Sequence, residues 1–166
     1  VLLLVGSKWY GNNEENDYVR EIKVEAEKLG AAIQMTGFIP PSEVADYFLL
    51  GDIFVCASQW EEPLARVHYE AMATGLSTIT TNRGGNPEVI IPGKNGIVIT
   101  DYENSGAFAD RIDYLLSRPN KREEMGRRGR ELAELHYGWS RVAWDILSVI
   151  NDSGLMSSLE KLGQAG

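Results

Sequence analysis

Apolar and polar residues alternate in blocks along the chain, and the blocks have the lengths of strands and helices. Short runs such as VLLLV and IFVCA are apolar throughout, which is typical of strands buried on both faces of a sheet. Longer stretches with apolar residues every three or four positions predict helices. The predicted strands are residues 1–5, 31–38, 52–58, 76–81 and 97–100; the predicted helices are 14–29, 40–51, 66–75, 103–117, 119–136 and 139–151.

This alternation of strands and helices predicts an α/β fold of the Rossmann-like kind, with a doubly wound parallel sheet and helices on both faces. We expect one domain over residues 1–151 and a frayed tail over residues 152–166. Ser42 is the predicted N-cap of the short helix after the second strand. Trp139, at the head of the last helix, is the predicted packing anchor of that helix.

Composition excludes several classes of function. The 166 residues carry a net charge of -8, which argues against nucleic acid or an anionic membrane as the partner. No apolar run approaches the roughly 20 residues that span a bilayer. The single cysteine, Cys56, lies in an apolar run and indicates a reducing compartment, so we expect a cytoplasmic protein. The chain begins without methionine in a buried strand, so we expect a piece of a longer protein.

Candidate chemistry centres on EEPLARVHYEAMATG, residues 61–75, which follows the third strand. Pro63 favours a first helical turn and places Glu62 before the helix, while Glu70 is expected in the second turn. Ligands of parallel sheets bind at the carboxyl ends of the strands, and this helix start brings free amides and Arg66 to that edge. A phosphate held there, with carboxylates binding hydroxyls on either side, describes a sugar nucleotide.

The same residues carry a family resemblance. The segment from Glu62 to Glu88 resembles the signature of retaining glycosyltransferases of family 4, also called group 1, which have the two-domain GT-B architecture. The segments TGFIPPSEVADYF and GWSRVA are also similar to family segments, and ARVHYEAM resembles spore-coat-type members. The matching residues are Glu62, Pro63, Glu70 to Ala73, Gly75, Gly84, Gly85 and Glu88.

The resemblance implies the C-terminal, donor-binding domain of such an enzyme, with a nucleotide-diphosphate sugar as substrate. Glu70 would bind the ribose, and Glu62, the candidate catalytic residue, the donor sugar. Pro63 would open the helix, and the backbone amides of Leu64, Ala65, Arg66 and Val67 would hold the diphosphate. The turn formed by Phe38 and Ile39 would lie near the base.

The resemblance also implies parts that would precede Val1, namely a first strand with a glycine-rich loop and the acceptor-binding N-terminal domain. Without them we expect the chain to be inactive alone. It would also leave a sheet edge open, so we expect homo-oligomers of the isolated chain. No Asp-x-Asp motif is present, so no metal or other cofactor is expected.

Other interpretations of these residues remain open. Arg66 and Glu70 could form a surface ion pair four residues apart, and Glu62 could be a solvated loop acid. His68 is better explained as a structural histidine than as a catalytic one. Ala65 replaces the family's glycine, which keeps alive a different class of function: a non-catalytic module that binds a nucleotide or a partner.

Overall fold

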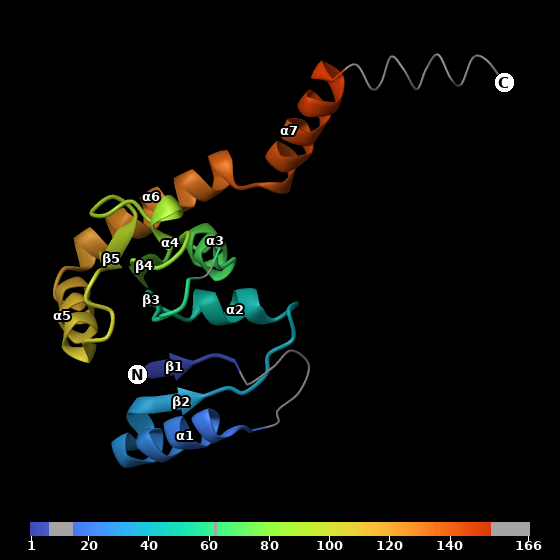
Figure 1. The fold of residues 1–166 in the computed structure, drawn as a ribbon. Helices are drawn as coiled ribbons and strands as arrows, with labels where there is room; N and C mark the ends of the chain where they lie inside the picture. Colours follow the sequence, from blue (N-terminus) through green and yellow to red (C-terminus); the bar gives the residue numbers. More distant parts are fainter. Residues whose placement is uncertain (7–14, 62, 154–166) are drawn as a thin grey trace. The chain divides into compact units, whose positions relative to one another are not determined.

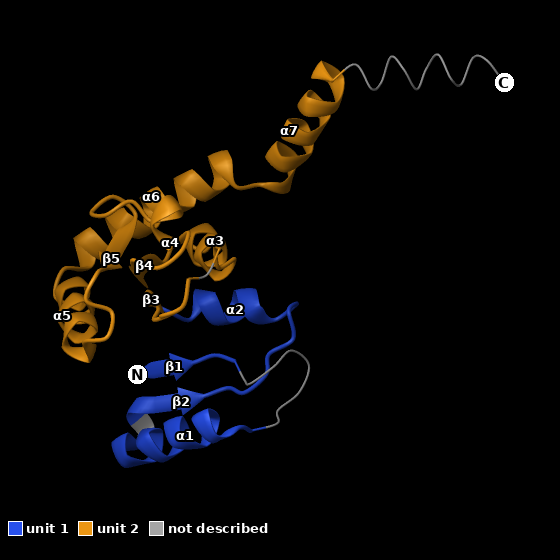
Figure 2. Ribbon diagram, in the orientation of Figure 1, with its two compact units in different colours: residues 1–51 blue, residues 52–166 orange. Residues whose placement is uncertain are grey.

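The computed structural model describes residues 1–6, 15–61 and 63–153. The chain divides into two compact units, residues 1–51 and residues 52–166, each described by itself (Figures 1 and 2). All strands that pair within the two sheets run parallel, and helices connect them. The predicted α/β fold with parallel strands is therefore confirmed.

The first unit is a strand–helix–strand element followed by a short helix. Strand β1 pairs with β2 in parallel, with Leu2 opposite Ile33. Helix α1 connects them: the Asn16 side chain caps its start by accepting from the Val19 amide, and Gly30 ends it at φ 64°. Ser42 is not the N-cap of α2, because that helix begins after Glu43, with no side-chain cap. The elements are β1 (Leu2–Leu4), α1 (Asp17–Leu29), a 3-10 turn (Gly30–Ala32), β2 (Ile33–Met35) and α2 (Val44–Leu49).

The second unit contains a three-stranded parallel sheet in the order β3-β4-β5. Each strand leads into a helix, so the loops after the strands lie at one edge of the sheet, where ligands of such folds bind. The elements are β3 (Ile53–Cys56), α3 (Val67–Ala73), β4 (Ser77–Thr81), α4 (Asn86–Val89), β5 (Gly96–Ile99), α5 (Ser105–Leu116), α6 (Pro119–His136) and α7 (Trp139–Asp152).

Alternate residues of each strand point to opposite faces of the sheet, and helices cover both faces. On one face, Ile79 and Ile99 pack with Leu115 of α5 and Met125 of α6. On the other face, Val98 packs against a second cluster. That cluster contains Met72, Val89, Ile90 and Ala133, from α3, the end of α4 and the second half of α6.

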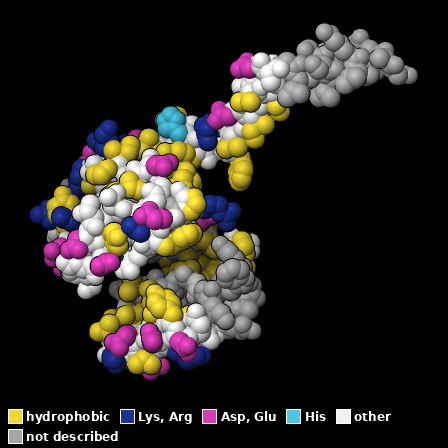
Figure 3. All heavy atoms as spheres, in the orientation of Figure 1, with side chains coloured by type: hydrophobic (Ala, Val, Ile, Leu, Met, Phe, Trp, Pro, Cys, Tyr) yellow, Lys and Arg dark blue, Asp and Glu magenta, His cyan; other side chains and the backbone are white. Residues whose placement is uncertain are grey.

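Helix α7 has no buried residue. Trp139 is 84% exposed, so the predicted packing anchor is wrong for the part of the chain that the structure describes. The apolar residues of α7 recur with the helical period and form a stripe, and Figure 3 shows hydrophobic side chains along this helix. None of the helices within residues 1–6, 15–61 and 63–153 is long and apolar enough to cross a bilayer.

Candidate functional site

The loop between β3 and α3, residues 57–66, leaves the carboxyl end of β3 and leads into the segment that the sequence singled out. Helix α3 begins at Val67, with Arg66 as its N-cap residue, and not at Pro63. Glu70 therefore lies in the first turn and not the second, where the helix dipole favours a carboxylate. The sequence expectation was wrong here because proline permits a helix start without requiring one.

The structure brings most of the predicted site residues into one segment. Pro63 is exposed, Leu64 and Val67 are half-buried, and Ala65 is 7% exposed. Arg66 is exposed and Glu70 is half-buried. Glu62 lies outside the described residues, and Phe38 with Ile39 follows β2 in the first unit.

His68 is a buried structural residue that anchors the end of the β3–α3 loop. Its ring is fully buried, with Nδ1 3.0 Å from the Ala65 carbonyl oxygen and Nε2 2.8 Å from Thr80 Oγ1. A carbonyl only accepts, so Nδ1 donates to Ala65, while Nε2 forms a hydrogen bond with the Thr80 hydroxyl. The ring also meets Phe54 edge-on, at 6.1 Å between centroids. These contacts leave His68 no exposed nitrogen for catalysis.

The neighbouring residue of β4 anchors the beginning of the same loop. Thr81 Oγ1 donates to the Ser58 carbonyl and accepts a 3.4 Å hydrogen bond from Asn86 Nδ2. Adjacent strand residues point to opposite faces, so Thr80 and Thr81 reach the two ends of the loop from the two sides of the sheet. The end of β4 thus fixes where the β3–α3 loop leaves and re-enters the fold.

A third anchor depends on Glu61 and Arg83, two residues for which no role was predicted. Glu61 Oε1 forms an ion pair with Arg83 Nη1 at 2.7 Å, and Glu61 Oε2 accepts from the Gly84 amide at 2.7 Å. Arg83 Nε donates to the Gln59 carbonyl, and its guanidinium lies 5.0 Å from the centre of the Tyr102 ring. The only sequence signal was the pair of adjacent acids, of which the family motif uses the second.

Position 85 has room only for glycine. A Cβ atom at Gly85 would lie 1.9 Å from the Pro63 carbonyl oxygen and 3.3 Å from Leu64 Cβ. The loop after β4 therefore rests directly on the backbone of the β3–α3 loop, which only a residue without a side chain allows.

The start of α3 offers free backbone donors. Among the described residues, no acceptor is found for the amides of Arg66 and Val67, whereas the His68 amide donates to the Ala65 carbonyl. The described ion pairs do not include one between Arg66 and Glu70, so the surface-pair interpretation finds no support. Within residues 1–6, 15–61 and 63–153, neither of these two side chains forms an ion pair.

Behind the start of α3, Tyr69 packs against Tyr137, with 4.6 Å between ring centroids. Burial raises the pKa of Tyr69 above its ordinary value, and Tyr137 and Glu88 raise it further against the lowering effect of Arg141. Tyr69 is therefore a neutral packing residue at physiological pH, and its ring supports the first turn that carries Glu70.

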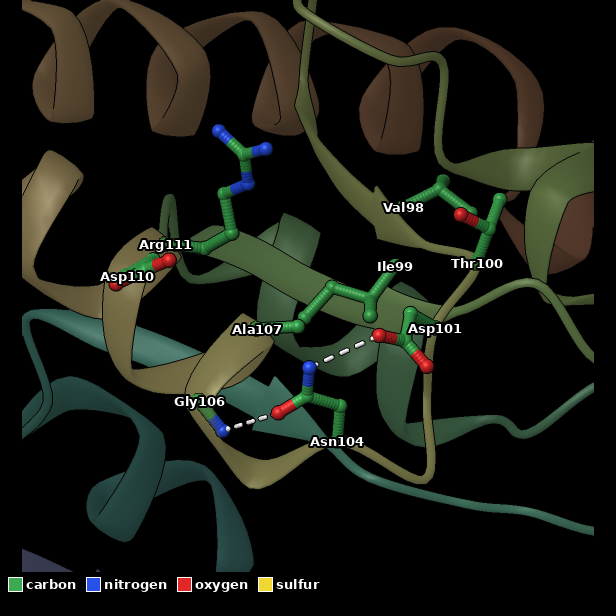
Figure 4. A pocket seen from close by; sticks show the side chains of 9 residues that line it. All are labelled: Val98, Ile99, Thr100, Asp101, Asn104, Gly106, Ala107, Asp110 and Arg111. Atoms are coloured by element: carbon green, nitrogen blue, oxygen red, sulfur yellow. Dashed lines mark hydrogen bonds between the residues drawn. The ribbon is translucent and has the colours of Figure 1, made fainter.

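A separate pocket of about 320 Å³ opens at the carboxyl end of β5, beside the start of α5 (Figure 4). Asn104 spans it: Nδ2 donates to Asp101 at 2.9 Å, and Oδ1 accepts from the Gly106 amide. Both functions of this amide are used by the protein, and the pocket is lined by two carboxylates, Asp101 and Asp110, and by the guanidinium of Arg111. Its lining residues all lie between Val98 and Arg111, outside the β3–α3 loop.

Residues 1–132 match the family of Glycosyl transferases group 1. The chain belongs to this family. The resemblance inferred from the segment between Glu62 and Glu88 is thus confirmed.

Among its relatives, the spore coat protein SA of Bacillus subtilis (strain 168) is 49% identical over 149 residues. The aligned region covers 90% of this group 1 chain and 40% of that protein, so the chain spans less than half the length of this relative.

Solved structures show the same fold. Sucrose-phosphate synthase from Thermosynechococcus elongatus superposes with a TM-score of 0.81 at 26% identity, covering 95% of this chain and 39% of that one. Anabaena HepE in complex with UDP-glucose superposes with a TM-score of 0.80 at 24% identity, covering 90% and 40%.

Proposed function

We propose that residues 1–151 form the donor-binding domain of a retaining glycosyltransferase, which moves a hexosyl group from a nucleotide-diphosphate sugar to an acceptor. The supporting observation is the triply anchored β3–α3 loop at the carboxyl ends of the strands, within a chain of the group 1 family. The chain alone is inactive in this proposal, because the acceptor-binding domain and a first glycine-rich loop belong to the rest of the protein.

Each site residue then has a role. Glu70, in the first turn of α3, binds the ribose hydroxyls, and the amides of the segment from Leu64 to Val67 hold the diphosphate. Within that segment Arg66 is exposed and Ala65 is buried, so the contact falls mainly on the amides of Arg66 and Val67. Phe38 and Ile39 contact the base.

Glu62 is proposed as the catalytic carboxylate beside the donor sugar. Glycosyl transfer passes through a state with positive charge on the sugar ring, which a nearby carboxylate stabilises. No metal is required in this scheme: Arg66 and the start of α3 supply part of the positive field on the diphosphate, and the remaining cations come from outside the chain. The proposal places this reaction in cytoplasmic polysaccharide biosynthesis.

Ala65 in place of glycine was the sequence feature that favoured a non-catalytic module. Ala65 is 7% exposed, so its methyl group lies within the fold and does not project over the exposed start of α3. The substitution is therefore compatible with a bound diphosphate. No specific observation favours the non-catalytic module over the transferase.

The test is a calorimetric titration of the chain with UDP-, GDP- and ADP-sugars, followed by the Glu70→Gln variant with the tightest ligand. Glutamine keeps the shape and removes the charge, so the loss of one charge-assisted hydrogen bond, about 1.5–3 kcal/mol, weakens binding roughly tenfold or more. The thermal midpoint should stay near that of the parent. Glu123→Gln, on the exposed side of α6, is the matched control.

Two results would refute this proposal. The first is no binding of any nucleotide sugar by the parent chain. The second is equal affinity of the parent and Glu70→Gln together with a lower melting temperature of the variant, which would make Glu70 a structural carboxylate.

A further inference from the structure

Arg83, in the loop after β4, contacts two other loops at the carboxyl edge of the second unit's sheet. Its guanidinium meets the Glu61 carboxylate at 2.7 Å and the Gln59 carbonyl at 2.9 Å, both in the β3–α3 loop. Its flat face lies over Tyr102, which follows β5. Gln59 Nε2 also donates to the Tyr102 carbonyl at 3.4 Å. The Arg83 side chain is only 27% exposed, which is low for an arginine on a loop.

Glu61 extends this arrangement to the backbone. One of its oxygens binds Arg83 and the other accepts from the Gly84 amide, so the carboxylate fixes two successive residues of the loop after β4. The next residue, Gly85, rests on the Pro63 carbonyl. The position of the Gly84–Gly85 backbone against Pro63 therefore depends on the Glu61–Arg83 ion pair.

We propose that Glu61 and Arg83 are positioning residues of the donor site, which set the distance between the Gly84–Gly85 turn and the β3–α3 loop without touching the donor. This proposal rests on the proposed function, and it assigns different roles to the two adjacent acids, Glu61 and Glu62. An arginine at the edge of a diphosphate site is more commonly a direct ligand. Here Nε and Nη1 are already engaged and a carboxylate neutralises the charge.

The two roles of Arg83 make opposite predictions for Glu61. If Arg83 binds the diphosphate, Glu61→Gln frees the guanidinium from its carboxylate and leaves donor affinity equal or higher. If the pair positions the loop, losing either partner displaces the same backbone, so both variants weaken binding. In that case the effects are also not additive, because the two side chains act as one unit.

The experiment measures the affinity of the chain for its best nucleotide sugar in Glu61→Gln, Arg83→Gln and the double variant. We expect each single variant to bind roughly tenfold more weakly, the scale of one lost charge-assisted contact, and the double variant to bind no worse than the weaker single one. Glu131→Gln is the control, because it removes the carboxylate of an exposed ion pair, with Arg127, that lies on α6 away from both loops. Unchanged affinity in both single variants, or a loss in Arg83→Gln alone, would overturn the proposal.

A second measurement needs no ligand and separates this proposal from the proposed function. Hydrogen exchange of the Gly84 amide should accelerate in Glu61→Ala, which removes the acceptor, and in Arg83→Gln, which releases the carboxylate. The Glu131→Gln control should leave it unchanged. Unchanged Gly84 exchange in both site variants would refute the positioning role even in a chain that binds nucleotide sugars normally. Failure of the parent chain to bind them would refute the proposed function alone.

Discussion

Replacing Gly85 by alanine tests how closely the proposed donor site depends on the contact between its two loops. The new Cβ would lie 1.9 Å from the Pro63 carbonyl oxygen, and real Cβ atoms essentially never come closer than 3.0 Å to another heavy atom. The loops must therefore separate by at least the difference, about 1.1 Å. The atom it meets belongs to the backbone, so no side-chain rotation relieves the overlap.

The cost of this substitution should appear mainly in binding. Gly85 has φ -81°, which alanine adopts without strain, so the whole effect comes from the overlap. Overpacking of a rigid core costs about 1–3 kcal/mol of stability; Pro63 is exposed but the obstructing atom belongs to the backbone, so we expect the lower end of that range. A displacement of about 1 Å in a substrate-binding segment reduces the reaction or its binding step by up to roughly 10²-fold. We therefore expect a large loss of affinity with a small loss of stability.

The assay combines calorimetric titration with the best nucleotide sugar and urea denaturation of the same samples. Gly138→Ala is the matched control, since a Cβ there meets nothing within 4 Å and Gly138 has φ -74°. The control should retain the parent's affinity and stability. The reasoning is refuted if Gly85→Ala binds as tightly as the parent, or if it loses stability and affinity in proportion, as expected when the whole fold is weakened.

Three further predictions follow from single features. Thr80→Val removes the hydroxyl that His68 Nε2 contacts, so urea denaturation should show a free energy of unfolding lower by about 1 kcal/mol or more. Thr80→Ser keeps the hydroxyl and should keep most of the parent's stability; equal losses in the two variants would implicate the methyl group instead. The hydrogen bond from Lys121, followed by the charge of Arg128, lowers the pKa of Glu124. Its stabilising effect is present above the pKa of the unfolded carboxyl and is lost as pH falls through the lowered folded value. Glu124→Gln should thus be less stable than the parent at neutral pH and equal to it in acid, and a difference that persists in acid would contradict this. Among the described residues of the first unit β1 pairs with β2 alone, so light scattering should detect oligomers through the open strand edge, and a monomer at high concentration would count against this.

Much of the fold follows from local pattern. Two signals, the 3.6-residue periodicity and the glycine after residue 29, predicted the longer helices. Every described helix of eight or more residues was predicted to within about three residues of each end. The helix signal is local because a helix that packs on a sheet needs an apolar stripe. Apolar runs describe the strands less well: β4 is buried at every residue although it is Ser-Thr-Ile-Thr-Thr, and Leu2 of the apolar β1, expected to be buried, is 47% exposed. The family signature in the segment after β3 was also recognisable from the sequence.

The sequence did not determine which residues hold the β3–α3 loop in place. Glu61 and Glu62 are adjacent acids in the same stretch of sequence, and only the fold shows that Glu61 contacts Arg83 and Gly84. The start of α3 was likewise set by packing and not by Pro63: Ala65 is buried, and His68 binds its carbonyl, which delays the helix to Val67.

Residues 61 and 83 are separated by a helix and a strand, yet they touch because parallel strands place all their carboxyl-end loops along one edge. Local pattern encodes the spacing and burial of each element. The contacts between loops depend on which strands are neighbours in the sheet, and that is settled only when the strands pair. The sequence therefore supplies the residue types of this site, while the tertiary structure determines which of them contact one another.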